Sequence, residues 1–201
     1  MAVSEKIKQL AENYKKNLDA KVNQRVQEMK LDNNEHYILY NALGVSDDEG
    51  NDIDVFQNKG RFLYKYAGSF IEEAAIICLK HAFQSASTIK VENTVSPRPK
   101  KYEIDCLVNE KYAFEIKWRD ATTDGDHINK EHARMRAVAS YGYTPIRLMF
   151  YKPLRDQAIK IQTKLKRIYE NEGGQYYAGK DAISSFIIFI CYFNSSSFFN
   201  C

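Results

Sequence analysis

The sequence predicts an α/β domain built on a mixed sheet, with a helical extension at the N-terminus. Between residues 69 and 170, helical apolar spacing and period-two alternation follow one another in the order helix, strand, strand, strand, helix, strand, helix. Residues 1–30, which precede this pattern, carry a single helical stripe of apolar side chains. A chain of 201 residues is long enough to bury the core of one such domain without disulfides.

The N-terminal stripe has apolar side chains three or four residues apart, at Ile7, Leu10, Ala11, Tyr14, Leu18, Val22, Val26 and Met29. This spacing predicts a long amphipathic helix. Three partners remain open for the stripe: the chain's own domain, a second copy of the chain, and DNA, because the helix is basic.

Charge is unevenly divided along the chain, although the formal total is only +3. Residues 31–58 hold seven acidic and no basic side chains, whereas the rest of the chain sums to +10. Such a chain can present a basic face to an anionic partner, but a solvated acidic loop on an ordinary globule explains the same counts. Residues 47–52, Asp-Asp-Glu-Gly-Asn-Asp, lack apolar periodicity and contain turn formers, so they predict a loop.

A second helical stripe runs over residues 62–83. Within it, Ser69 and Glu72 fit a capping box, in which each side chain binds an amide at a helix start, so we expect the helix to restart at Ser69. Residues 88–95 alternate apolar and polar side chains and predict a strand, which ends at Ser96-Pro97-Arg98-Pro99.

The remaining elements follow the same two periodicities. Residues 101–108 and 112–118 predict a β-hairpin, residues 128–141 a helix with Ile128, Met135 and Val138 inward, residues 145–151 a buried strand, and residues 154–170 an amphipathic helix closed by Gly173-Gly174. The last 20 residues, 182–201, carry no charge and are expected to form a tail of uncertain structure.

The cysteines and the apolar runs bear on the compartment. Cys78, Cys106, Cys191 and Cys201 are far apart, and the N-terminus has no signal-peptide pattern, so reduced thiols in a cytoplasmic protein are expected. The longest apolar run, residues 186–193, is well short of the roughly 18 to 20 residues that a membrane span needs, so no membrane partner is expected.

Three charged residues of the hairpin form the candidate catalytic group. Glu115 and Lys117 are two apart on one strand and share a face. If the hairpin loop is centred on Glu110, Asp105 lies opposite Glu115, with Cβ atoms about 4.5 to 5.5 Å apart. The two carboxylates then repel unless a cation lies between them, and Mg²⁺ is the natural candidate. The amine of Lys117 can orient or help deprotonate a water, or stabilise charge on a phosphate.

A purely structural interpretation of the hairpin also remains open, because the same register pairs Glu103 with Lys117. In that case Glu103, Asp105, Glu115 and Lys117 form only the solvated face of the hairpin. The buried face would then consist of Ile104, Cys106, Val108, Phe114, Ile116 and Trp118.

The order of elements around Asp105-x9-Glu115-x-Lys117 resembles the PD-(D/E)xK nuclease superfamily over residues 69–152. Ile104 stands where the superfamily has Pro, a departure that removes no ligand. A more specific resemblance lies in Phe-Glu-Ile-Lys-Trp-Arg-Asp-Ala-Thr-Thr-Asp-Gly-Asp-His-Ile at residues 114–128, in Lys130-Glu131-His132, and in residues 145–151 and 157–159. These segments are similar to the ApaLI-like type II restriction endonucleases, over most of residues 59–181.

The resemblance implies a restriction-endonuclease-like core of order α-β-β-β-α-β, with a mixed central sheet flanked by helices. In such a core Asp105 and Glu115 would bind the metal and Lys117 would be the catalytic lysine. A further metal ligand is implied on the preceding helix. Glu73 is preferred over Glu72 there, because Glu72 has the competing role in the capping box.

The loop and helix after the hairpin carry candidate DNA contacts, namely Thr122, Asp124, His127, Lys130, Arg134 and Arg136. Lys and Arg bind phosphates, and Arg also reads the major-groove edge of guanine. Two alternatives stay open: a salt-bridged helix face, and a zinc site formed by His127 and His132 with Asp124 or Asp126.

The resemblance implies a Mg²⁺-dependent type II restriction endonuclease that cuts both strands of double-stranded DNA at a short specific site and leaves 5′-phosphate ends. A palindromic site requires a homodimer, and a cognate DNA methyltransferase is implied as a genetic partner. The alternatives are a non-catalytic DNA-binding module of the same fold and another nuclease of the superfamily, such as a junction resolvase or repair nuclease. The expected organisation is a helical extension with an acidic loop at 1–58, a nuclease core at 59–181 and the uncharged tail at 182–201.

Overall fold

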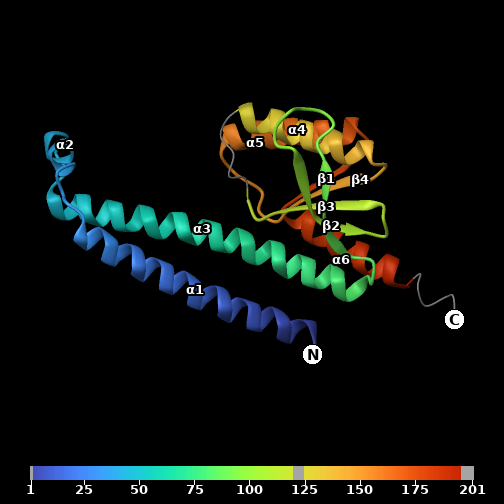
Figure 1. Cartoon of the computed structure of the whole chain (residues 1–201), viewed down its shortest axis with the longest axis horizontal. Helices are drawn as coiled ribbons and strands as arrows, with labels where there is room; N and C mark the ends of the chain where they lie inside the picture. The colour runs from blue at the N-terminus through green and yellow to red at the C-terminus, as the bar shows by residue number, and fades with distance from the viewer. Residues whose placement is uncertain (1, 120–124, 196–201) are drawn as a thin grey trace. The chain divides into compact units, whose positions relative to one another are not determined.

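The computed structural model describes residues 2–119 and 125–195. The chain divides after Phe70 into two compact units, and the long helix α3 (Asp47–Ala82) runs from the first unit into the second (Figure 1). Within the described residues, no helix is both long enough and apolar enough to cross a membrane.

The first unit is a pair of long helices joined through a short one. Helix α1 (Val3–Leu31) confirms the predicted amphipathic helix, and α2 (Tyr37–Ala42) was not predicted. The apolar stripe of α1 faces α3 of the same chain, where the ring of Tyr14 lies 6.0 Å from that of Tyr66 and 5.9 Å from that of Phe70. Of the three partners left open for the stripe, the structure therefore shows the chain itself.

The expected loop at residues 47–52 is wrong, because these residues form the first turns of α3. The reason is a capping box at Ser46: its amide donates to Glu49 Oε2 at 3.0 Å, and its hydroxyl accepts from the Glu49 amide at 3.4 Å. Acidic side chains in a first helical turn are stabilised by the helix dipole, so Asp47 and Asp48 favour a helix start. The capping box expected at Ser69 is also wrong, since α3 passes through it without a break.

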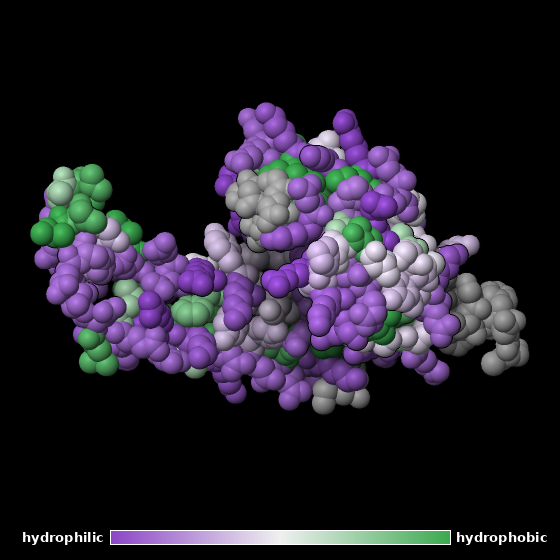
Figure 2. All heavy atoms as spheres, turned by 45° about the horizontal axis from the view of Figure 1, so that its top comes forward, coloured by the Kyte–Doolittle hydropathy of each residue, from purple (hydrophilic) through white to green (hydrophobic). Residues whose placement is uncertain are grey.

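Several large apolar side chains of the first unit are exposed around α2, namely Leu31, Ile38, Leu39, Leu43, Ile53 and Phe56. Figure 2 shows the resulting green patch at the end of this unit. A cluster of this kind on a charged chain marks a surface that is suited to a partner.

The second unit is built on a five-stranded sheet of order β1-β2-β3-β4-β5. Strand β2 (Lys101–Val108) is antiparallel to both of its neighbours, β1 (Ser87–Glu92) and β3 (Tyr112–Lys117), whereas β4 (Thr144–Met149) and β5 (Gln175–Ala178) run parallel to β3. The predicted mixed sheet is thereby confirmed, together with the hairpin and the helices α4 (Gly125–Ser140) and α5 (Asp156–Asn171). Strand β5 was not predicted.

Helices cover both faces of this sheet (Figure 1). One face packs on the end of α3 and on α6 (Lys180–Ser195), with Leu79, Phe114 and Phe186 in its core. The other face packs on α4 and α5, with Ile104, Met135 and Leu165 among the buried side chains. A strand between two covered faces must bury both sets of its side chains.

The expected tail at residues 182–201 is wrong for residues 182–195, which lie in α6. Ala182 is fully buried, and the ring of Phe189 packs 4.9 Å from that of Phe114 and 5.5 Å from that of Phe83. One side of α6 therefore packs on the apolar sheet face, whereas Ile183, Ile187, Ile188 and Tyr192 on the same helix are exposed. Residues 196–201 lie outside the described part of the chain.

Candidate active site

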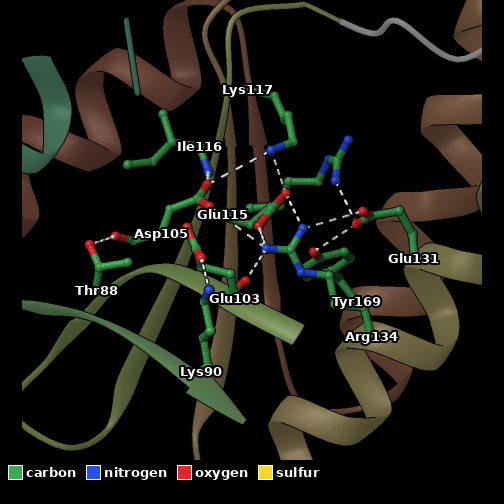
Figure 3. Close-up of polar contacts among 11 residues, drawn as sticks. Thr88, Lys90, Glu103, Asp105, Glu115, Ile116, Lys117, Glu131, Arg134 and Tyr169 are labelled. Atoms are coloured by element: carbon green, nitrogen blue, oxygen red, sulfur yellow. Dashed lines mark hydrogen bonds and ion pairs between the residues drawn. The ribbon is translucent and has the colours of Figure 1, made fainter. Parts of the chain in front are cut away.

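The three predicted catalytic residues come together where β2, β3 and α4 meet (Figure 3). Lys117 Nζ lies 2.5 Å from Glu115 Oε1 and 3.8 Å from Asp105 Oδ2. Asp105 and Glu115 are only 7% and 5% exposed. The structural interpretation of this face as merely solvated is therefore wrong, because both carboxylates are buried beneath α4.

The hairpin register brings Asp105 to β3 in a way that simple ladder pairing does not. The predicted register holds for Cys106 with Phe114 and for Val108 with Tyr112. At Asp105 a side-chain hydrogen bond takes the place of a backbone one. Asp105 Oδ2 accepts a hydrogen bond from the amide of Ile116 at 2.7 Å. The main chain of β3 thus fixes the Asp105 carboxylate.

A β-bulge on the other side of β2 contributes to this arrangement. Ser87 pairs with Leu107 but Ile89 pairs with Ile104, so β2 has one more residue than β1 across the stretch that contains Asp105. Bulges of this kind redirect side chains next to active sites. Ile104 and Cys106 accordingly pack in different cores although they are two residues apart, which corrects the prediction that both belong to one face.

Arg134 of α4 enters the same cluster. Its two terminal nitrogens contact the two carboxylate oxygens of Glu115, and Nη2 also donates to the carbonyl of Glu103 at 2.5 Å. Asp105 Oδ1 lies 3.7 Å from Nη2. The Arg134 side chain, expected to contact DNA, is therefore turned inward and is only 18% exposed.

A second charged layer lies behind Arg134 and was not predicted. Glu131 Oε2 accepts from Arg147 Nη1 at 2.7 Å and from the Tyr169 hydroxyl at 3.5 Å, and Glu131 Oε1 lies 3.6 Å from Arg134 Nη1. Two signals could have identified this layer. Glu131 and Arg134 share the helical spacing of the inward residues Met135 and Val138, and Arg147 is the lone charge in the apolar strand β4.

The glutamate of α3 that is near the cluster is Glu72, and not the predicted Glu73, its neighbour in the sequence. Glu73 is exposed, whereas Glu72 is half-buried. The pKa of Glu72 is raised by burial, and Lys117, Glu115 and Arg134 are near enough to influence it. Since α3 has no capping box at Ser69, the competing role assigned to Glu72 disappears. Glu72, rather than Glu73, is therefore the helix glutamate within electrostatic reach of the cluster.

Burial and charge set the protonation of the three central groups. Burial, reinforced by Glu115, raises the pKa of Asp105 to about 7, although Lys117 and Arg134 act against this. Burial also opposes the ionised form of Glu115, but Arg134, Lys117 and Arg147 outweigh it and lower the pKa of that carboxyl. For Lys117, Glu115 and Asp105 outweigh burial and raise the pKa. Lys117 is therefore an ammonium at neutral pH, which can stabilise negative charge but cannot accept a proton.

The donor set fits a hard divalent cation held by few protein ligands. Asp105 and Glu115 present carboxylate oxygens in one buried place, where burial and the neighbouring Glu115 raise the pKa of Asp105. Among the described residues, no group of three or more His, Cys, Asp or Glu side chains could hold a metal ion. Mg²⁺ is commonly bound through one or two carboxylates, with water and phosphate oxygens completing its shell.

The remaining predicted DNA contacts are only partly described. Thr122 and Asp124 lie outside the described residues, as does the side chain of His127. Lys130 and Arg136 are exposed on α4. The zinc alternative falls on the same undescribed side chains, except for His132, whose Nε2 lies 3.3 Å from Glu172 Oε1. Sequence reasoning missed Arg119, whose guanidinium lies 5.6 Å from the ring centroid of Trp118 and 5.3 Å from that of Tyr151.

Comparison with known proteins defines the class. Residues 1–186 match the model of a family of restriction endonucleases, which are nucleases that bind double-stranded DNA and generally use a divalent metal ion. Since the match includes both units, the chain belongs to the ApaLI-like restriction endonuclease family. Comparisons with the curated proteins and with the solved structures gave no significant match.

Proposed function

We propose that the protein is a type II restriction endonuclease of the PD-(D/E)xK superfamily, which hydrolyses phosphodiester bonds in both strands of a short specific DNA site. The reaction is Mg²⁺-dependent and leaves 5′-phosphate ends. The observation that carries the proposal is the buried approach of Asp105, Glu115 and Lys117 in a chain of a restriction endonuclease family.

The two carboxylates and the lysine have different roles in this proposal. Asp105 and Glu115 would hold the divalent ion, which would supply positive charge at the scissile phosphate and lower the pKa of the attacking water. The ammonium of Lys117, one-third exposed, stabilises the negative charge that develops on the phosphate. Glu72 replaces Glu73 as the preferred helix carboxylate, because it is the one that senses the cluster.

We place the DNA contact on the side of α4 that remains accessible. Lys130 and Arg136 are exposed on α4, His127 belongs to the first turn of the same helix, and Thr122 and Asp124 precede it in the sequence. Phosphate contacts of this kind position DNA, whereas base contacts specify its sequence. The proposed catalytic residues all belong to the second unit, whereas residues 59–70 of the predicted core fall in the first.

The assembly that we propose is a homodimer, which a palindromic site requires. The exposed apolar patch around α2 supports this proposal, since large apolar patches on a chain are suited to protein partners. A cognate DNA methyltransferase that protects the host is part of the same proposal and follows from the restriction activity.

The test is a cleavage assay on plasmid DNA, with Mg²⁺ and with EDTA. We expect discrete fragments with Mg²⁺, none with EDTA, and none from Lys117→Ala. Lys166→Ala serves as the charge-matched control, because Lys166 is exposed on α5 and pairs only weakly with Glu170 at 3.8 Å.

The outcomes separate the proposed function from its rivals. Cleavage of branched DNA alone would identify a junction resolvase. Binding of duplex DNA, with no cleavage whichever divalent ion is added, would identify a non-catalytic DNA-binding module. Sequencing of the fragment ends would then give the recognition site and the cut position.

A further inference from the structure

The feature that carries a further inference is the place of Arg134 between the two central carboxylates (Figure 3). We propose that Arg134 is a resident cation of this site, which a divalent ion must displace from Glu115. The free protein then binds the metal weakly, and DNA binding strengthens metal binding. This inference rests on the proposed nuclease function, because it assigns Asp105 and Glu115 to the metal.

The contacts of Arg134 leave little of Glu115 available. Both carboxylate oxygens are in contact with the Arg134 guanidinium, and Oε1 is also 2.5 Å from Lys117 Nζ. The contact at Oε1 is a hydrogen bond and the contact at Oε2 is an ion pair, and hydrogen bonds between ionised groups are about twice as strong as neutral ones. A divalent ion bound to Glu115 would lie close to two monovalent cations and would be repelled by both.

The charge balance of the buried cluster points in the same direction. The carboxylates of Asp105, Glu115 and Glu131 face the three cations Lys117, Arg134 and Arg147. These six groups sum to zero when all are ionised, and Glu72 of α3 adds one negative charge within their electrostatic reach. A divalent ion therefore leaves the cluster with a net positive charge in a place that is largely closed to water. A DNA phosphate supplies negative charge at the same point, which couples the two binding events.

Arg134 has a second acceptor when it leaves Glu115. Glu131 Oε1 lies 3.6 Å from Arg134 Nη1, one helical turn earlier on α4. Arg147 holds the Glu131 carboxylate through a 2.7 Å hydrogen bond, so this acceptor is already in position. A small rotation of the Arg134 side chain therefore moves its guanidinium from Glu115 to Glu131, or to a DNA phosphate that approaches α4.

The test is calorimetric titration of the DNA-free protein with CaCl₂ at pH 8, with the wild type, Arg134→Ala and Arg167→Ala. Arg167 is an exposed arginine of α5 that controls for the change in net charge. We expect Arg134→Ala to bind Ca²⁺ at least tenfold more tightly than the wild type, and Arg167→Ala to bind as the wild type does. Unchanged or weaker binding by Arg134→Ala would overturn the proposal, because it would show that Arg134 merely positions Glu115.

A second variant guards against loss of folding. Arg134→Lys keeps the charge but not the bidentate contact, so its Ca²⁺ affinity should fall between those of the wild type and Arg134→Ala. Circular dichroism melting identifies any variant that does not fold. An affinity of Arg134→Lys equal to that of the wild type, beside tighter binding by Arg134→Ala, supports displacement of charge. Weaker binding by both variants contradicts it.

The coupling between metal binding and DNA binding is measured through the effect of Ca²⁺ on DNA affinity. Because the coupling free energy is shared, Ca²⁺ should strengthen the binding of labelled plasmid fragments to the wild type, and should do so by a smaller factor for Arg134→Ala. An equal factor in both proteins contradicts the proposed role. Failure of the wild type both to cleave DNA with Mg²⁺ and to bind Ca²⁺ would remove the nuclease proposal itself, whereas cleavage without tighter binding by Arg134→Ala removes only this inference.

Discussion

The two faces of the central sheet differ in what they bury. The face beneath α3 and α6 is apolar, with Leu79, Phe114 and Ile116 at its centre. The face beneath α4 and α5 buries Asp105, Glu115 and Arg147 as well as apolar side chains. The same strands thus have one apolar face that stabilises the fold and one face with buried charged side chains. Such charges are tolerated in the interior only because each is paired with an opposite charge.

The largest expected effect comes from removing one partner on the charged face. Arg147→Met should cost about 3 to 5 kcal/mol of unfolding free energy, because the Glu131 side chain, only 20% exposed, loses its 2.7 Å partner and keeps only Arg134 at 3.6 Å as a cation. The double variant Arg147→Met/Glu131→Leu should recover most of this loss. Urea unfolding of the two variants and the wild type measures both effects. A double variant no more stable than the single one would show that the buried charges do not act as a pair.

A truncation on the apolar face should cost slightly less. Leu79 is fully buried, and Leu79→Ala should lower the unfolding free energy by about 3 kcal/mol through lost burial and the cavity left behind. The charged face should be intact, so cleavage assayed at low temperature should remain. Loss of cleavage in a variant that is still folded would show that the two faces are not independent.

The third prediction concerns the pH dependence that the charged face introduces. The pKa of Asp105 is about 7 in the folded state against an ordinary 3.8, so the folded state binds this proton more tightly. The stability that this proton contributes is complete below about pH 4 and is lost as the pH rises to about 7. At pH 4 the Asp105 carboxyl of the folded wild type is protonated and uncharged, as the amide of Asp105→Asn is. The two proteins should therefore have similar unfolding free energies at this pH.

At pH 8 Asp105→Asn should instead exceed the wild type by on the order of 2 to 4 kcal/mol, although it should not cleave DNA. Thermal melts at both values of pH measure the difference. A constant difference between the two proteins would contradict a raised pKa at Asp105. Glu103→Gln, an exposed change on the same strand, provides the control.

The smallest effect is expected at the exposed rim of the same sheet. Lys90 Nζ pairs with Glu103 at 3.2 Å, and both side chains are more than half exposed. Lys90→Ala should change the unfolding free energy by less than about 1 kcal/mol, because exposed ion pairs are weak and screened by salt. Urea unfolding at two salt concentrations measures the change. A cost comparable to that of Arg147→Met would mean that burial does not distinguish the two pairs.

The sequence predicted most elements of the second unit because their periodicity is strong. The hairpin followed from alternation, and a loop centred on Glu110 gave the register that holds at Cys106 and Val108, whereas Asp105 meets β3 through its side chain. The start of α3 differs from the prediction because acidic turn formers also begin helices when a capping box precedes them, as Ser46 and Glu49 do here. Helix α6 was missed because its exposed side, which includes Ile187 and Ile188, is apolar like its buried side, so the segment shows no amphipathic periodicity.

The inward role of Arg134 could not be read from composition. Arginine on a helix beside a hairpin is as compatible with DNA contact as with a buried ion pair, and only the packing of α4 on β3 distinguishes the two. The same holds for the bulge in β2, since an extra residue leaves no periodic signal but changes which face a side chain enters. These are the two points at which the site depends on tertiary contacts.

The hairpin turn has a consequence for how relatives of this protein can differ. Asn109 and Glu110 have φ angles of 53° and 50°, so the turn is tight and could be replaced by a longer one. Asp105 is fixed by the amide of Ile116, across the strands and away from the turn. The number of residues between the two carboxylates is therefore a property of the turn rather than of the chemistry. A relative with a longer loop could keep the same site, and a search for a fixed spacing would overlook it.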